Sequence, residues 1–144
     1  MDKQQTPGQH DEKIFREGIA IFSEGDLREL INYIYSEYQY NGAQLDKLIK
    51  VINYLTSESN RYVNPELAGQ SMKLSAYLDT FLEFLKFNFH PGKQNDEGDT
   101  IYFFQVQETG SETEAFLAEF QMLALDAEKA YRNYRAAIIS KLEL

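Results

Sequence analysis

The chain has 144 residues, of which 43% are hydrophobic and 14% aromatic, with no cysteine and a formal net charge of −9. This length and composition suit one globular domain with a sizeable core, because a disordered chain would contain few Phe and Tyr. The absence of cysteine excludes disulfides, thiolate zinc ligands and cysteine nucleophiles, and the negative charge disfavours binding to nucleic acid or to an anionic membrane.

Polar residues fill the first part of the chain. Residues 1–11 include Pro7 and Gly8 and predict a flexible tail, followed by a single helical domain over residues 12–144. Residues 13–22 are ambiguous, because their apolar side chains recur at helical spacing while the last four (IAIF) could equally form a short buried strand. We favour the helix for this segment.

No apolar stretch of the kind found in signal peptides occurs near the start of the sequence. No later run approaches the roughly 20 continuous apolar residues that a membrane-spanning helix needs. We therefore expect a cytoplasmic protein that does not enter a membrane.

Two short helices are predicted next. From Asp26, apolar residues fall on one helical face until Asn41 and Gly42 interrupt the pattern, and residues 44–56 show a second such face. Because the connection between them is short, the two helices are expected to form an antiparallel hairpin.

Two long helices make up most of the remaining chain. Pro65 is well placed to begin a helix that reaches about residue 89, and residues 112–142 form the longest periodic segment. Between them, residues 101–107 are expected to be either a strand, which could pair with residues 19–22, or a loop held by its aromatic side chains. The predicted fold class is thus all-α or nearly so, a bundle of about four helices with a possible two-stranded insertion.

Helix lengths favour self-association. At 1.5 Å per residue the last helix would span about 45 Å and each helix of the short hairpin only about 20 Å, so one hairpin cannot cover it. Leu125 and Ile139 also lie off its main apolar face. Part of this helix should therefore contact either the N-terminal segment or a second copy of the chain, and we favour a homodimer.

Some aromatic residues lie outside the apolar faces of the predicted helices. Aromatic side chains in such positions are typical of protein interfaces, so we predict that these residues bind a partner: Tyr33, Tyr40, Tyr54 and Phe87. Packing inside the protein's own core is the alternative, and it is the one we favour for Tyr77 and Phe84.

The sequence contains no pattern that predicts catalysis. His10 and His90 each lack a second histidine at metal-site or triad spacing, and the loop at residues 90–99 fails the calcium-loop pattern. No serine lies in a nucleophile elbow and no phosphate-binding glycine loop occurs. We expect no catalytic centre, no metal site and no cofactor.

These observations favour a non-catalytic protein–protein interaction module, such as an accessory subunit, an adaptor or an acidic inhibitor or immunity-type protein. Its aromatic anchors would lie within an acidic surface. The alternative is a small-ligand-binding or enzymatic helical bundle that uses carboxylates and tyrosines converging inside it.

Overall fold

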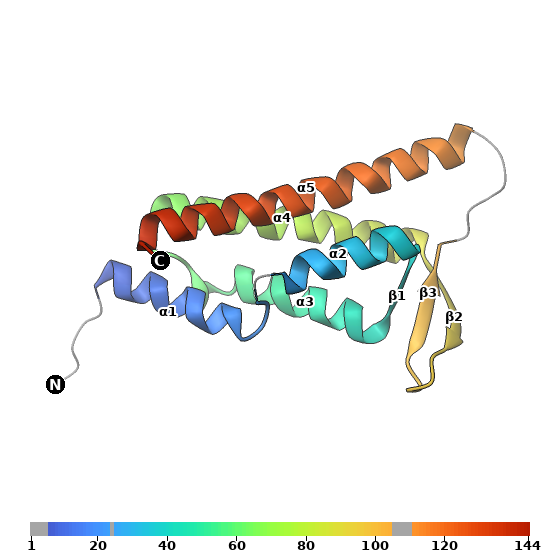
Figure 1. Ribbon diagram of the computed structural model, residues 1–144, viewed down its shortest axis with the longest axis horizontal. Coiled ribbons are helices and arrows are strands. Elements are labelled where there is room, and N and C mark those ends of the chain that lie inside the picture. Colours follow the sequence, from blue (N-terminus) through green and yellow to red (C-terminus); the bar gives the residue numbers. More distant parts are fainter. Residues whose placement is uncertain (1–5, 24, 105–110) are drawn as a thin grey trace.

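The computed structural model describes residues 6–23, 25–104 and 111–144, with only the backbone at positions 111 and 112. The described residues are mostly helical, with five α-helices and a small three-stranded antiparallel sheet (Figure 1). This confirms the expectation of a nearly all-helical protein with a small strand insertion. The elements in chain order are α1 (Pro7–Ile19), α2 (Asp26–Glu37), β1 (Gln39–Asn41), α3 (Gly42–Thr56), a short 3-10 helix η1 (Glu58–Asn60), α4 (Pro65–Asn88), β2 (His90–Gln94), β3 (Thr100–Phe103) and α5 (Ser111–Leu142).

Helix α1 begins earlier than predicted. Thr6 and Gln9 form a capping box around Pro7, so residues 7–11 are helical and the predicted tail was too long there. Residues 1–5 lie outside the described part of the chain. The preference for helix over strand at residues 13–22 is confirmed through Ile19, after which the chain turns.

A strand, and not a plain turn, connects α2 to α3. The backbone of Tyr38 is left-handed, with φ of 52°, and its N–H donates to the Ile34 carbonyl, which ends α2. After β1, the Asn41 side chain accepts from the Gln44 N–H at 2.8 Å and starts α3. The two helices run in opposite directions (Figure 1), but α2 approaches α5 most closely and α3 approaches α4.

The two long helices lie antiparallel along each other (Figure 1). Asn64 caps α4 by accepting from the Glu66 N–H at 2.9 Å, and Pro65 occupies the first turn as predicted. The buried face of α5 combines large side chains with alanines, and Phe120, Tyr134 and Ile138 lie inside.

The sheet was predicted only in part. Strand β3 is central and pairs with β1 on one side, where Tyr40 faces Tyr102, and with β2 on the other. The expected pairing with residues 19–22 was therefore wrong, because those residues end α1 and form a turn. Residues 105–107 of the predicted strand lie outside the described residues.

Aromatic side chains fill the core where the sheet meets the long helices. Phe120 is fully buried, and its ring lies 5.3 Å from those of Tyr35 and Phe84. The other rings of this cluster are those of Tyr38, Tyr40, Phe81, Phe89, Tyr102, Phe104 and Phe116. Three of the four tyrosines in residues 33–40 (YIYSEYQY) thus belong to the core.

Two carboxylates hold distant segments together by binding backbone N–H groups. Asp11 of α1 is buried and accepts from the N–H groups of Val63 and Asn64 at 2.7 and 2.9 Å, just before α4. Asp99, beside β3, accepts from the first N–H groups of α3 at 3.1 and 2.9 Å. A carboxylate at a helix N-terminus is favourable because the helix dipole is positive there.

Candidate functional site

Tyr40, predicted to bind a partner, lies inside the protein. Its side chain is only 2% exposed, its ring stacks on Tyr102 at 5.0 Å, and its hydroxyl donates to the Leu85 carbonyl at 3.3 Å. Burial, and then the neighbouring Tyr102, raises the pKa of Tyr40 to about 12. The reason for the error is that residues 39–41 form a strand, which turns this side chain away from where a continued helix would have placed it.

Tyr54 is likewise engaged within the chain. Its hydroxyl donates to the Ile14 carbonyl of α1, and its ring makes an edge contact with Phe22 at 6.3 Å. Burial, and then the charge of Glu17, raises the pKa of Tyr54 to about 12. Tyr54 lies outside the main apolar face of α3, as predicted, but α1 packs over it, so its side chain contributes to the fold and not to a partner surface.

Tyr33 and Phe87 are exposed on α2 and α4, at 41% and 80% of their surface. The Tyr33 hydroxyl accepts from the Gln39 side-chain amide at 3.2 Å. Phe84 is buried against Phe116, as predicted for a side chain that packs in the core. Core packing was also predicted for Tyr77, but that side chain is 43% exposed. Of the four predicted partner-binding residues, only Tyr33 and Phe87 are thus available at the surface.

A continuous exposed row runs along α5 on the side away from the core, and we call it the outer stripe. Its spacing alternates between three and four residues, which is the repeat of a coiled-coil seam. The outer stripe consists of Ala118, Met122, Leu125, Lys129, Arg132, Ala136 and Ile139, all exposed. Met122 and Leu125 are 55% and 54% exposed, which is unusual for two neighbouring large apolar side chains.

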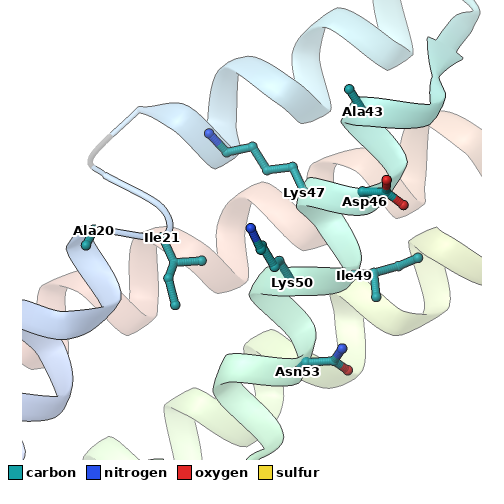
Figure 2. A pocket seen from close by; sticks show the side chains of 8 residues that line it. All are labelled: Ala20, Ile21, Ala43, Asp46, Lys47, Ile49, Lys50 and Asn53. Carbon is teal, nitrogen blue, oxygen red and sulfur yellow. The ribbon is translucent and has the colours of Figure 1, made fainter. Parts of the chain in front are cut away.

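An open groove of about 670 Å³ separates the turn after α1 from α3 (Figure 2). Ile21 and Ile49 supply apolar surface, and Lys47 and Lys50 project from α3 beside them. Lys47 pairs with Asp26 at 3.4 Å. Asp46 also lines the groove, so the two lysines are matched in number by two carboxylates, Asp26 and Asp46. The groove therefore favours neither anionic nor cationic ligands.

The described residues show little that could perform acid–base chemistry. Their one buried carboxylate, Asp11, is occupied by backbone N–H groups. The Nε2 atom of His10 lies 3.1 Å from the Arg61 carbonyl, and His90 is exposed. Over the same part of the chain, no group of three or more His, Asp or Glu side chains is arranged to hold a metal ion.

Comparisons with known proteins identify no family for this chain. No family model matches the chain, and no curated protein or solved structure matches it. Within the described residues, no helix combines the length and the apolar character needed to cross a bilayer.

Proposed function

We propose that this protein is a non-catalytic interaction module, and that the outer stripe of α5 is the surface through which it associates. The observation that carries the proposal is the seam-like spacing of the outer stripe, with Met122 and Leu125 each more than half exposed. The opposite face of α5 is already buried in the core, so this stripe is not needed for the fold of one chain.

A second copy of the chain is the occupant that the charge pattern favours. In the first part of α5, Glu114 and Glu119 are exposed, and in the later part Lys129 and Arg132 are exposed. A parallel pair of α5 helices would place like charges together. An antiparallel pair brings the acidic part of each helix beside the basic part of the other, which is the arrangement that electrostatics favours.

Antiparallel pairing centred near Leu125 brings Met122 and Leu125 of both copies to the middle of the contact. At 1.5 Å per residue, Glu119 then lies at the level of Arg132 on the other copy. An apolar centre flanked by charged pairs is the usual anatomy of a protein interface. The proposed contact between two α5 helices resembles the contacts between helices of a bundle, which is the arrangement predicted from the sequence.

Single cysteines test the orientation directly, because the chain has none of its own. In the antiparallel arrangement, Leu125→Cys forms an intermolecular disulfide under mild oxidation. Ala118→Cys is the matched control, since its two copies would lie about 20 Å apart along the helices. Efficient cross-linking of both variants would indicate a parallel pair, and cross-linking of neither would remove the proposed contact.

Tyr33 and Phe87 stay candidates for a separate protein partner. Phe87 is 80% exposed on a long helix, and burying such a ring would contribute about 2 kcal/mol. With the chain at −9, a basic partner is favoured for such a surface, as expected of an adaptor or an acidic inhibitor. Their role would be distinct from that of the outer stripe, since they lie on α2 and α4.

The ligand-binding or enzymatic alternative depends on carboxylates converging in an enclosed cavity. The described residues bury one carboxylate, Asp11, and it is engaged by two N–H groups. The structure therefore lends this alternative no support, and we do not propose it.

A further inference from the structure

A pocket of about 370 Å³ lies between the end of α3, the short helix η1 and the first half of α4. Its volume falls in the range of roughly 300–1,000 Å³ that is typical of small-molecule sites. We call it the serine pocket, because neutral hydrogen-bonding side chains make up much of its lining: Thr56, Ser57, Asn60, Tyr62, Ser71 and Ser75. None of its lining residues comes from α5, so the serine pocket is separate from the outer stripe.

Ser71 brings an unused hydroxyl group to the serine pocket. This residue is only 4% exposed, and its side chain makes no hydrogen bond with any described residue. A hydroxyl that is buried without a partner destabilises the folded state, and such groups in native proteins usually have a reason. A ligand atom that accepts from the Ser71 hydroxyl would supply the missing hydrogen bond.

Other hydroxyl groups of the serine pocket have already donated their protons to the backbone. The Thr56 hydroxyl donates to the Ile52 carbonyl at 2.9 Å, and the Ser75 hydroxyl donates to the Met72 carbonyl at 2.9 Å. Because a hydroxyl has one proton and two lone pairs, these two groups can only accept from a ligand. The pocket therefore suits a molecule that carries both a hydrogen-bond acceptor and N–H or O–H donors.

Apolar groups complete the wall. Leu55 is buried, and Ala68 and Ala76 add small apolar surface along α4. Met72 is 62% exposed, and its flexible side chain can adapt to the shape of a ligand. These side chains would contact an apolar part of the molecule.

The charges around the serine pocket favour an uncharged ligand. Among the described residues that line it, only Glu58 and Arg61 are charged, and these two have opposite signs and are both exposed. The charge of Asp11 acts on Tyr62, but Asp11 does not line the pocket and already accepts from two N–H groups. A charged ligand would thus lose its hydration without gaining an opposite charge in the inner wall.

We propose that the serine pocket binds a small uncharged molecule that carries an amide or hydroxyl group on an apolar body. Ser71 donates to the acceptor oxygen of this molecule, and Thr56 and Ser75 accept from its N–H or O–H groups. The proposal goes beyond self-association. It also differs from a site built on converging carboxylates, because neutral side chains make these hydrogen bonds.

Benzamide is a suitable probe, because it is uncharged and carries an amide group on an apolar ring. Benzoate and benzylammonium are matched controls with the same ring, one an anion and the other a cation at neutral pH. Each is titrated into the full chain at constant ionic strength, and amide NMR spectra are recorded. We expect benzamide to give saturable shifts at the N–H groups of Asn60 and Ser71, with a dissociation constant of about 1 mM. The two ions should bind at least about tenfold more weakly.

Ser71→Ala removes the free donor and should weaken benzamide binding about fivefold. Since the hydroxyl has no partner among the described residues, this variant should unfold at the same urea concentration as the wild-type chain or at a higher one. Weaker binding would then not reflect a damaged fold. Ser36→Ala, on α2 and outside the pocket lining, is the matched control and should change binding less than about twofold.

A second pair of variants tests the location of the bound probe. Ala76 is exposed where it lines the pocket, so Ala76→Phe should fill the pocket and abolish benzamide binding without disturbing the core. Thr80→Phe, at an exposed position one turn later and outside the lining, should leave binding unchanged.

Three results would overturn the proposal. They are the absence of saturable benzamide shifts up to about 50 mM, binding of either ion as tight as that of benzamide, and wild-type affinity in Ser71→Ala. Light scattering without added probe measures self-association separately, so failure of this proposal can be told from failure of the proposed function.

Discussion

The hydroxyl groups of Tyr62 and Tyr134 lie 2.6 Å apart inside the protein, between the loop that precedes α4 and the later part of α5. The two side chains are 4% and 2% exposed, and their rings meet edge to face at 6.2 Å. They come from positions 72 residues apart, so this hydrogen bond joins segments that local structure does not connect. One hydroxyl donates to the other, and either could be the donor.

Removing one of these hydroxyls should destabilise the protein by more than the net contribution of one hydrogen bond, because the other hydroxyl is left unpaired. Tyr62→Phe or Tyr134→Phe leaves a buried hydroxyl without its partner, and each should lower the free energy of unfolding by about 1–3 kcal/mol. The double variant should lose about 1 kcal/mol less than the sum of the two, because it leaves neither hydroxyl behind. Urea unfolding of the four proteins measures the cycle, and strict additivity would show that the hydroxyls are not coupled.

Stability should fall in alkaline solution. Burial raises the pKa of Tyr40 and of Tyr54 from 10.0 to about 12, and it also raises the pKa of Tyr62 and of Tyr134. Between pH 10 and 12 the unfolded chain therefore loses tyrosine protons that the folded chain retains, so the unfolded state is favoured as pH rises. Urea unfolding from pH 9 upward should show this decline beginning near pH 10, and a flat profile up to pH 12 would contradict it.

Asp11 should be essential to the attachment of α1. Asp11→Ala leaves the N–H groups of Val63 and Asn64 without their acceptor, and it should lower the free energy of unfolding by about 2–3 kcal/mol. Asp11→Asn, which keeps one acceptor oxygen, should lose less. Asp96→Ala, at an exposed position after β2, is the control and should stay within about 0.5 kcal/mol. Equal stability of Asp11→Ala and the control would mean that the carboxylate does not hold this junction.

Two glycines should respond to alanine in opposite directions. A Cβ atom at Gly92 would overlap the Phe103 ring, so Gly92→Ala should destabilise by about 1–2 kcal/mol. Adding Phe103→Ala should relieve that overlap and make the Gly92 substitution nearly neutral in the new background. At Gly69, within α4, a Cβ would meet no atom within 4 Å, and Gly69→Ala should stabilise by about 0.5–1 kcal/mol. Thermal unfolding distinguishes the two, and a stable Gly92→Ala variant would show that the ring can move away freely.

Local patterns predicted the helices well. The apolar stripes of α2, α3, α4 and α5 correspond to their buried faces, and Pro65 begins α4 as expected. The early start of α1 was also predictable from the sequence. Residues 6–9 (TPGQ) place a threonine cap, a proline and a glutamine at the spacing of a capping box. Treating residues 1–11 as a tail overlooked this signal.

Contacts between residues far apart in the sequence could not be predicted from local patterns. The position of Tyr40 depends on β3, whose residues lie about 60 positions later, and Tyr54 is covered by a helix that begins nearly 50 positions earlier. Helical periodicity carries no information about either contact. The outer stripe was partly foreseen, because Leu125 and Ile139 were recognised as off the main face.

Self-association through the outer stripe is tested most directly by the solution mass, measured by light scattering from about 1 µM to about 1 mM. The wild-type chain should approach twice the mass of one chain, and Leu125→Glu should remain at the mass of one chain while keeping its helical content. Met72→Glu replaces a similarly exposed apolar residue on α4 and should still dimerise. A wild-type mass of one chain at every concentration, or a dimer that Leu125→Glu leaves intact, would contradict the proposal.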